Sequence, residues 1–413
     1  MKNKFKKFLF LAIIFGITLA FLGKNLNSQA QTKPLARKIV VFKSGVLNAN
    51  EREFLIEKLG GVKIKDLSLI EGKAVLLTPE AENTLSKLPG VLRIDDDVEV
   101  FALENFEKPS LLKHSGRIQR VKPRIQRVKP QPAQTITWNV DRVDAEISWS
   151  ISTGDPVKVG VIDTGIDLKH PDLKENIKGG YNAINPSKSP NDDNGHGTHV
   201  AGIIAALNNN IGVVGVGPKI DLYAIKVLNA SGSGYLSDVI EGLQWAVSNG
   251  MQVVNMSLGT SQDVQSFHDA ILSAYEAGVT IVAAAGNTGG SVIYPAAYPE
   301  VIAVSATDEN DQIASFSSRG PEIDLAAPGV SIYSTYKGST YKTLSGTSMA
   351  APHVAGAAAL LIDTKKCDLN FDGTCPPSEV KQKLEQTAID LGNDGIDNLY
   401  GAGLVNVYKA LTE

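Results

Sequence analysis

Three separated segments of this chain each place one reactive polar residue among glycines and other small residues. The segments span residues 159–165, 194–202 and 345–353, and they carry Asp163, His196 and Ser348. A hydroxyl that attacks a carbonyl needs an imidazole to take its proton, and that imidazole needs a carboxylate to fix its tautomer and stabilise its charge. Each residue alone is more often a cap or a satisfied polar group. Together they predict a site for nucleophilic acyl transfer.

The order of the three residues along the chain indicates a fold, because unrelated folds carry the same triad in different orders. The order Asp, His, Ser is that of subtilisin. Ala350 stands where the Gly-x-Ser-x-Gly pattern of α/β-hydrolases has its second glycine, which disfavours that fold. On these motifs the chain resembles the subtilisin family of secreted serine proteases from about Gln134 to its last residue. The resemblance implies a three-layer α/β catalytic domain with a mostly parallel sheet, acting as a monomer on protein or peptide substrates.

The resemblance also implies the residues around the triad. Asn287 matches the side-chain donor for the oxyanion, with the backbone N–H of Ser348 as the second donor. Two stretches match the edges of a substrate cleft, namely Gly232, Ser233 and Gly234, and Ser257, Leu258 and Gly259. Leu236 and Val239 match an apolar pocket, and we expect Ile293 at the base of the primary pocket. These residues predict a preference for apolar substrates.

Two other functions stay open at this point. One is a processing protease of narrow specificity. The other is a binding protein that keeps the protease fold without its activity, which fold alone does not exclude.

The N-terminus has the pattern of a secretory signal. Residues 1–7 are rich in lysine, an apolar run follows over 8–22, and Ala30 ends a small-residue cleavage site. This pattern predicts a signal peptide over residues 1–30 and a secreted, extracellular protein. A retained anchor is the alternative, although the apolar run is short for a membrane span, and we expect no stable membrane association.

Residues 31–107 have the pattern of a small α+β domain. Strands are predicted at 37–42, 62–67, 73–77 and 91–100, with helices at 50–59 and 79–88. This β-α-β-β-α-β order is ferredoxin-like. It resembles the inhibitory propeptide of subtilisin-like enzymes, which implies an intramolecular chaperone and inhibitor. A permanent binding domain is the alternative.

Residues 108–132 differ in composition from both neighbours. They contain a tandem duplication, 117–123 followed by 124–130, with six basic residues and no acidic ones. This composition predicts an extended linker that is accessible to proteases. We expect the maturation cut within it, with the bond before Ala133 as a candidate. Nucleic-acid binding through this run is the alternative.

Residues 133–413 form the predicted catalytic domain. They hold 16 Lys and Arg against 31 Asp and Glu, which disfavours a nucleic-acid partner and suits a protein that recruits cations. Apolar strands at 157–162, 222–227, 252–256, 279–284 and 301–305 alternate with helices at 236–248 and 264–277, as in a parallel sheet covered on both faces. Small-residue helices are expected at 197–207 and 349–362, directly after His196 and Ser348. Pro352 is expected in the first turn of the second helix, where the missing N–H costs little stability.

Two loops are candidates for Ca²⁺. The stretch 207–213 resembles the family's high-affinity calcium loop, whose ligands would be Leu207, Asn209, Ile211 and Val213 with Gln134 and Asp172 from outside. Independently of the family, Asp368, Asn370, Asp372, Thr374 and Glu379 stand at positions 1, 3, 5, 7 and 12 of an EF-hand spacing, with Gly373 at position 6. Cys375, Pro376 and Pro377 depart from the usual pattern. Plain polar turns are the alternative for both loops.

Two cysteines and two further histidines complete the candidates. Cys367 and Cys375 are expected to form a disulfide in an oxidising compartment, with free thiols as the alternative. His199 and His353 are expected to be packed, hydrogen-bonded residues. A zinc site is disfavoured because the His-Glu-x-x-His pattern is absent.

Overall fold

The computed structural model describes residues 34–103 and 131–413. The predicted signal peptide 1–30 and the linker up to residue 130 lie outside the described residues. From Ala36 to Glu413 the chain forms one compact unit by its internal contacts. Within the described ranges, no helix is both long and apolar enough to cross a membrane.

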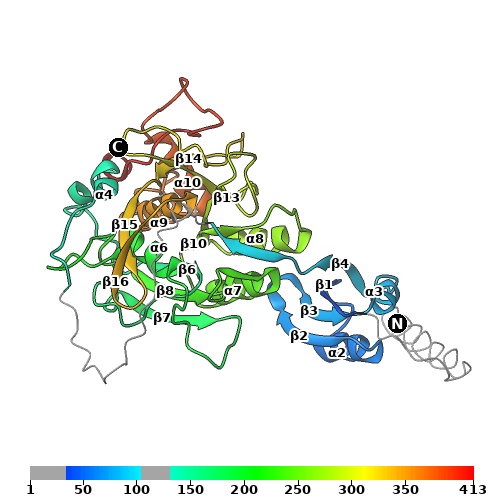
Figure 1. Ribbon diagram of the computed structural model, residues 1–413. Helices are drawn as coiled ribbons and strands as arrows, with labels where there is room; N and C mark the ends of the chain where they lie inside the picture. Colours follow the sequence, from blue (N-terminus) through cyan, green and yellow to red (C-terminus); the bar gives the residue numbers. More distant parts are fainter. Residues whose placement is uncertain (1–33, 104–130) are drawn as a thin grey trace, which may run out of the picture. The chain divides into compact units, whose positions relative to one another are not determined.

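An N-terminal α+β domain has the predicted β-α-β-β-α-β order (Figure 1). Its antiparallel sheet has the strand order β2-β3-β1-β4. Both helices begin at residues that suit a helix start. Asn48 and Glu51 form a capping box, and Thr78 caps a helix whose first residue is Pro79. The elements are β1 (Ala36–Phe42), α2 (Ala49–Lys58), β2 (Val62–Leu67), η1 (Ser68–Ile70), β3 (Gly72–Leu77), α3 (Pro79–Leu85) and β4 (Val91–Asp96).

The last strand of this domain is shorter than the sequence predicted. Instead of one strand over 91–100, β4 ends at Asp96 and a separate strand, β5 (Glu99–Ala102), follows. β5 lies in another sheet, between β11 (Leu258–Gly259) and β9 (Ser233–Tyr235). The break falls at Asp97. Its buried carboxylate accepts hydrogen bonds from Ser237, and the chain therefore leaves the strand pairing of β4 at this residue.

The catalytic region is built on a seven-stranded sheet of order β14-β13-β12-β10-β6-β8-β7. Every neighbouring pair is parallel, which confirms the predicted α/β class. β7 and β14, at the two edges, were not predicted. The strands are β6 (Lys158–Asp163), β7 (Ile177–Asn182), β8 (Asp221–Lys226), β10 (Val253–Met256), β12 (Thr280–Ala284), β13 (Val301–Thr307) and β14 (Leu325–Pro328).

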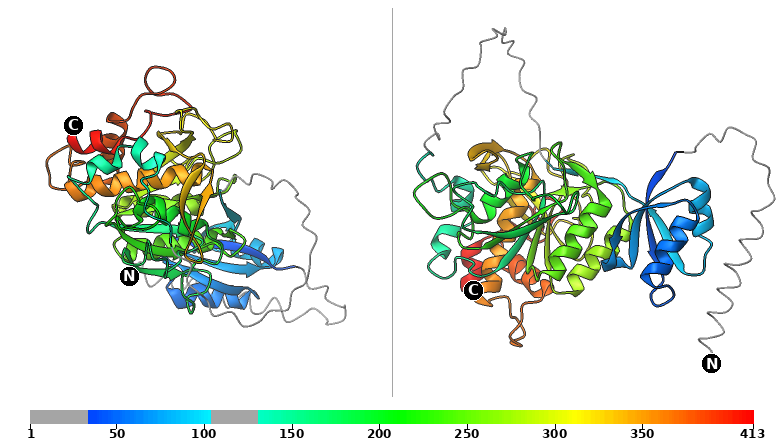
Figure 2. Two further views of the ribbon diagram at one scale, coloured as in Figure 1. Left: turned by 60° about the vertical axis from the view of Figure 1, so that its left-hand side comes forward. Right: turned by 90° about the horizontal axis from the view of Figure 1, so that it is seen from below.

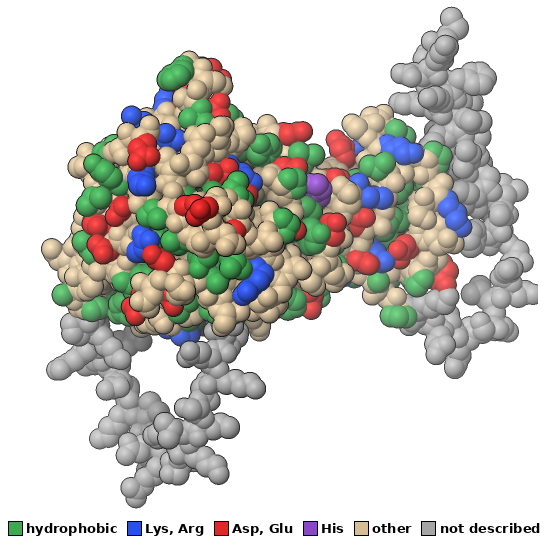
Figure 3. Space-filling model, turned by 90° about the horizontal axis from the view of Figure 1, so that it is seen from above, with side chains coloured by type: hydrophobic (Ala, Val, Ile, Leu, Met, Phe, Trp, Pro, Cys, Tyr) green, Lys and Arg blue, Asp and Glu red, His purple; other side chains and the backbone are tan. Residues whose placement is uncertain are grey.

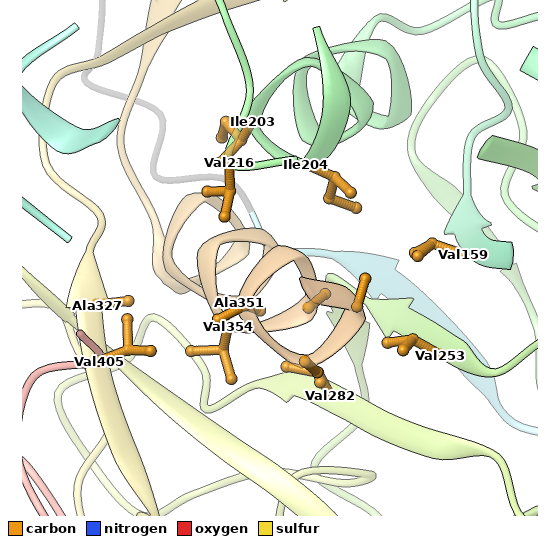
Figure 4. Packing of buried hydrophobic residues seen from close by; sticks show 14 of the residues in the cluster. Val159, Ile203, Ile204, Val216, Val253, Val282, Ala327, Ala351, Val354 and Val405 are labelled. Carbon is orange, nitrogen blue, oxygen red and sulfur yellow. The ribbon is translucent and has the colours of Figure 1, made fainter. Parts of the chain in front are cut away.

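Alternating residues of this sheet face two separate cores, which gives the predicted three layers. Val253 and Val282 pack with α6 (His196–Ala205) and α9 (Thr347–Thr364), as Figure 4 shows around α9. Their neighbours Val254 and Ile281 pack with α7 (Leu236–Ser248) and α8 (Gln265–Glu276) on the opposite face (Figure 2). The remaining elements are α4 (Trp138–Arg142), α5 (Ala145–Ser148), β15 (Ile332–Tyr336), β16 (Thr340–Leu344), α10 (Pro377–Gln386) and α11 (Val407–Thr412).

The carboxyl ends of the central strands carry the predicted site. Asp163 is the last residue of β6, Ser257 follows β10, and Asn287 follows β12. α6 begins at His196, and α9 begins one residue before Ser348. Ligand sites of open parallel sheets lie at this edge. On the face drawn in Figure 3, acidic, basic and hydrophobic side chains are interspersed.

Candidate active site

Asp163 and His196 are in direct contact. Nδ1 of His196 lies 2.8 and 2.9 Å from the two carboxylate oxygens of Asp163, and both side chains are fully buried. The N–H of Thr164 also donates to Asp163, at 2.6 Å. Because a carboxylate can only accept here, Nδ1 carries the hydrogen, and Nε2 is left as the basic nitrogen of the neutral ring.

A second buried carboxylate, Asp192, joins the segments that carry Asp163 and His196. It accepts from the Thr164 hydroxyl at 2.9 Å and from the N–H of Gly195, the residue before α6, at 2.8 Å. Its other oxygen accepts from the N–H of Thr198 at 3.0 Å. Nothing in the sequence pattern singled out Asp192 from the adjacent Asp193, so the sequence analysis did not find this support.

Ser348 lies in the first turn of α9 and is fully buried. Its Oγ donates to the carbonyl oxygen of Ser257 at 3.1 Å. The helix starts earlier than predicted, so Pro352 lies in the second turn, and the expectation of a first-turn proline was wrong. A residue there would normally donate its N–H to the carbonyl of Ser348. Proline has none, and the Ser348 carbonyl accepts from the Ser257 hydroxyl at 2.9 Å instead.

Asn287 is oriented by α9 and contacts the chain's own Leu103. Its Oδ1 accepts from both the N–H and the hydroxyl of Thr347 at 2.9 Å, which fixes the direction of the amide. Its Nδ2 then donates to the carbonyl oxygen of Leu103 at 2.7 Å. The N–H of Leu103 donates to the Ser257 carbonyl at 3.2 Å. Leu103 and the Ser348 hydroxyl therefore share one acceptor.

The residues before Leu103 lie between the two predicted cleft edges. β5 pairs antiparallel with β9, where Val100 stands opposite Gly234 and Phe101 opposite Ser233. On its other side, Ala102 stands opposite Leu258. The third predicted glycine, Gly232, accepts through its carbonyl from the N–H of Ala102 at 2.9 Å. The chain's own segment thus occupies the strand position expected for a substrate.

Apolar side chains of this segment contact the catalytic region. Val100 is fully buried in one cluster with the predicted pocket residues Leu236 and Val239. Leu103 packs against the other core of the sheet. Ile293 lies close to Gly259, so that a Cβ at residue 259 would be only 2.7 Å from its Cδ1. Glycine at this position therefore leaves room for the Ile293 side chain and for the Tyr294 carbonyl.

Two carboxylates of the N-terminal domain cap helices of the catalytic region. Asp97 accepts from the N–H of Ser237, in the first turn of α7, at 2.8 Å. Asp95 accepts from the N–H of Ser266, in the first turn of α8, at 3.1 Å. Such N–H groups have no partner within their helix, and a negative charge is favourable at this end. Burial raises the pKa of Asp97 above its ordinary value, against the lowering effect of Ser237 and Arg37.

Ion pairs add to this contact between the two regions. Lys65 pairs with Asp238 and, at 2.8 Å, with Glu241, both on α7. Arg93 pairs with Asp269 on α8. The partly buried positions of these groups make the pairs stronger than fully exposed ones. The basic side chains of the N-terminal domain therefore complement acidic side chains of α7 and α8.

His199 and His353 are buried and hydrogen-bonded, as expected. Nε2 of His199 lies 3.0 Å from the carbonyl oxygens of Ile332 and Lys342. Nδ1 of His353 donates to the Met349 carbonyl at 2.9 Å, and its Nε2 accepts from Asn139. Burial lowers the pKa of His199 to about 3 and that of His353 to about 4. Both rings are therefore neutral at pH 7.

The predicted outside ligands of the first calcium loop meet that loop in the structure. Asp172 accepts from Nδ2 of Asn209 at 2.8 Å and from the N–H of Val213 at 3.0 Å. Oε1 of Gln134 accepts from the N–H of Asn209, and Ala133 pairs with Ile211. Burial raises the pKa of Asp172 to about 6. One carboxylate with amide and carbonyl oxygens is a donor set that fits calcium, which accepts such mixed oxygen ligands.

The second loop is closed by the predicted disulfide, which the structure contains between Cys367 and Cys375. Asp368 accepts from the N–H groups of Asp372 and Gly373, at 3.0 and 2.9 Å, within the loop. Glu379 reaches back from α10 to the N–H of Leu369 at 3.0 Å. Over residues 34–103 and 131–413 no group of three His, Cys, Asp or Glu side chains has metal-binding geometry. Any ion here would therefore need the loop to close further around it.

Comparison with known proteins agrees with this geometry. A family model described as the subtilase family matches residues 154–403. This chain belongs to the subtilase family. The alkaline protease of Shouchella clausii is 43% identical over 88% of this chain and 86% of its own length. Subtilisin Savinase of Lederbergia lenta is 50% identical over 67% of this chain and 99% of its own length, and subtilisin E of Bacillus subtilis is 40% identical over 98% and 99%.

As a subtilase, the protein is a subtilisin-like serine endopeptidase. The matched region contains all three triad positions and Asn287. The interdomain role of Asp95 and Asp97 could not be predicted from local sequence patterns, because their partners lie more than 130 residues away. The contact of Leu103 with Asn287 could not be predicted either, since no local pattern distinguishes Leu103 from its neighbours.

Proposed function

We propose that this chain is the precursor of a secreted, calcium-stabilised serine endopeptidase that cuts off its own N-terminal domain. The observation that carries the proposal is the position of Leu103, whose carbonyl oxygen accepts from Asn287. The Ser348 hydroxyl donates to the Ser257 carbonyl, which also accepts a hydrogen bond from the Leu103 N–H. Secretion rests on the sequence of residues 1–30.

The proposed reaction uses Ser348 as the nucleophile. Its Oγ bonds to the carbonyl carbon of the scissile peptide while Nε2 of His196 takes its proton, and Asp163 stabilises the resulting imidazolium. Nδ2 of Asn287 and the N–H of Ser348 donate to the oxyanion. The peptide bond then breaks as His196 gives its proton to the leaving amine. Water, deprotonated by His196, next hydrolyses the acyl-enzyme, and Ser348 regains its hydrogen.

The contacts of Leu103 favour the Leu103–Glu104 bond as the maturation cut. The sequence alone favoured the linker, with the bond before Ala133 as a candidate. That bond is engaged elsewhere, because the Pro132 carbonyl accepts from the N–H of Gly212 at 2.9 Å and Ala133 pairs with Ile211. We therefore propose residues 31–103 as the inhibitory propeptide, which blocks the cleft with β5 until the cut is made.

N-terminal sequencing tests this assignment. We expect the first product of the wild-type protein to begin at Glu104. The Ser348→Ala variant should stay uncut, and its peptidase activity should fall by about 10⁶-fold, the loss found when subtilisin loses its serine. A first product beginning at Ala133 would contradict the proposed cut, and an active Ser348→Ala variant would contradict the mechanism.

The propeptide's own residues support an apolar substrate preference. Val100 and Leu103 place apolar side chains against the catalytic region. Val100 belongs to the same buried cluster as Leu236 and Val239. We expect faster cleavage of peptides after Leu or Phe than after Lys or Arg. The measurement is kcat/KM on peptides that differ only at this residue, and the reverse order would contradict the preference.

Calcium is proposed as a stabilising ion rather than a participant in the chemistry. The side chains of Gln134, Asp172 and Asn209 would hold it with carbonyls of Leu207, Ile211 and Val213. The second loop would use Asp368, Asn370, Asp372 and Glu379 with the carbonyl of Thr374. Chelation should lower the melting temperature, and an unchanged melting temperature would remove calcium from the proposal.

A further inference from the structure

Two sets of contacts that flank the basic linker are made by the same uncut chain. On one side, Leu103 contacts Ser257 and Asn287 in the cleft. On the other side, residues 131–135 already contact the first calcium loop and Ser339, the residue before β16. The contacts are Gln131 Nε2 to Ser339 O at 3.3 Å, Gly212 N to Pro132 O at 2.9 Å, Gln134 N to Asn210 O at 3.3 Å and Thr135 N to Gly212 O at 2.9 Å.

These two docking places lie at opposite ends of α6. Ala102 lies by Gly232, which is also next to Asn194, just before the start of α6. The calcium loop begins two residues after the last residue of α6, Ala205. A ten-residue helix spans roughly 15 Å. Consecutive Cα atoms are only about 3.8 Å apart, so a chain in which residue 131 directly followed Leu103 could not satisfy both places at once.

The segment between Leu103 and Gln131 removes this conflict by its length alone. It contains 27 residues, including the duplicated 117–130. At about 3.3–3.6 Å per residue, such a segment can reach up to roughly 90 Å, several times the helix length.

We propose that the first calcium loop is complete and binds calcium in the uncut precursor, so that calcium binding does not depend on the maturation cut. This rests on the proposed cut after Leu103 and on calcium as the ion of this loop. Gln134 is the residue that makes the proposal specific. It is the predicted ligand nearest to the linker, and its Oε1 already lies at the N–H of Asn209 while Leu103 is bound in the cleft.

With this linker, calcium binding and the maturation cut are separate events, whereas a shorter linker would couple them. With the linker present, the cut releases the propeptide but does not have to move residues 131–135, because they are already bound. The catalytic region would therefore gain its calcium-dependent stability before it becomes active.

The test uses the full-length Ser348→Ala precursor, with Asp372→Asn to weaken the second loop and with calcium chloride alone as the probe. Calcium affinity is measured by titration calorimetry, and the melting temperature is measured with and without calcium. The same protein cut in trans by a trace of wild-type enzyme gives the processed form. We expect equal affinities, within a factor of about three, and equal calcium-induced melting shifts for the uncut and cut forms.

Two variants make the result specific to the first loop. Gln134→Ala should weaken calcium binding roughly 10- to 100-fold in both forms, the range found when a group supporting a metal is removed. The matched control Gln312→Ala, at an exposed glutamine outside the loop, should leave the affinity unchanged. Deletion of residues 104–130 should abolish calcium binding to this loop in the uncut form and restore it after cutting in trans.

The test distinguishes a failure of this inference from a failure of calcium as the ion of the loop. Tight calcium binding by the cut form with binding at least about tenfold weaker in the uncut form would overturn the inference and leave calcium as the ligand. A deletion variant that binds calcium as tightly before cutting as after would overturn the role given to the length of the linker. Absence of calcium binding in both forms would instead overturn calcium as the ion of this loop.

Discussion

The two main sheets of the molecule differ in what covers their faces. The seven-stranded sheet is covered on both faces by helices of its own region, α6 and α9 on one side and α7 and α8 on the other. The four-stranded sheet of the N-terminal domain has its own helices, α2 and α3, for one face only. Ile39, Val41 and Ala74, on the other face, belong to the same buried cluster as residues of α7 and α8.

Under the proposed maturation, this difference would distinguish the catalytic region, which remains, from the N-terminal domain, which is removed. A sheet that uses a neighbour's helices for one face exposes apolar side chains when the neighbour is lost, which costs about 25 cal/mol per Å² of exposed apolar area. The catalytic sheet loses no layer in the same event. If the proposed cut takes place, we therefore expect the N-terminal domain to be stable mainly when docked and the catalytic region to remain folded after separation.

After Ser348→Ala, Asn287→Ala should give the next largest loss of activity, with both regions still folded. It removes the donor to the Leu103 carbonyl, and we expect kcat to fall roughly 100- to 1000-fold, as for other oxyanion donors. Maturation should slow by a similar factor, because the same donor serves the chain's own bond. The measurements are kcat on a peptide and the rate of precursor cleavage. Wild-type values of both would remove Asn287 from the mechanism.

Acidification should weaken the catalytic region through its buried histidines. Because burial lowers the pKa of His353 to about 4, its neutral form adds stability that is present above the ordinary pKa of 6.5 and is lost as the pH falls through 4. A lowering of this size corresponds to about 3 kcal/mol. We expect His353 to contribute that loss to the fall in the free energy of unfolding of the Ser348→Ala protein between pH 7 and pH 4, measured with urea, and His199 to add to the fall.

His353→Gln is the control for this pH effect. It cannot take up a proton in this range, so its pH dependence should be flatter than that of the parent, with the His199 contribution remaining. The same slope in both proteins would show that His353 does not contribute to the pH dependence.

Asp97→Ala should give the smallest effect and should weaken only the binding of the proposed propeptide. It removes the cap of α7 and the partner of Arg37, and caps contribute about 0.5–2 kcal/mol. The inhibition constant of the added propeptide should rise by about 2- to 30-fold, with the melting temperature of the catalytic region unchanged. Asp96→Ala is the matched control, because Asp96 is exposed and, among the described residues, forms an ion pair with Lys38 of its own domain. Equal effects of the two substitutions would contradict the capping role.

Much of the fold could be predicted because it depends on local patterns. The central strands are continuous apolar runs, and the triad motifs stand at their ends and at helix starts. The edge strands escaped prediction for physical reasons. β7 reads Ile-Lys-Gly-Gly-Tyr-Asn, with Gly180 where a Cβ would be 2.2 Å from the Ala224 carbonyl, and β14 ends in a proline. Neither composition is typical of a strand.

The parts of the site that the sequence did not reveal depend on distant contacts. The break at Asp97 follows from a hydrogen bond to Ser237, and the position of Leu103 follows from strands that lie more than 120 residues later. The proposed calcium ligands Gln134 and Asp172 could be predicted only through the family resemblance, since nothing in their own surroundings indicates a shared site.

The disulfide ring around the second loop has a consequence for a protease that meets copies of itself at high concentration. Phe371 stands at the tip of this ring with 91% of its surface exposed, which makes it an accessible apolar target for self-digestion. A nick on either side of Phe371 would leave the two new ends tethered through the bond between Cys367 and Cys375. The helix α9, which carries Ser348, would then stay covalently attached to the C-terminal segment after the backbone had been broken.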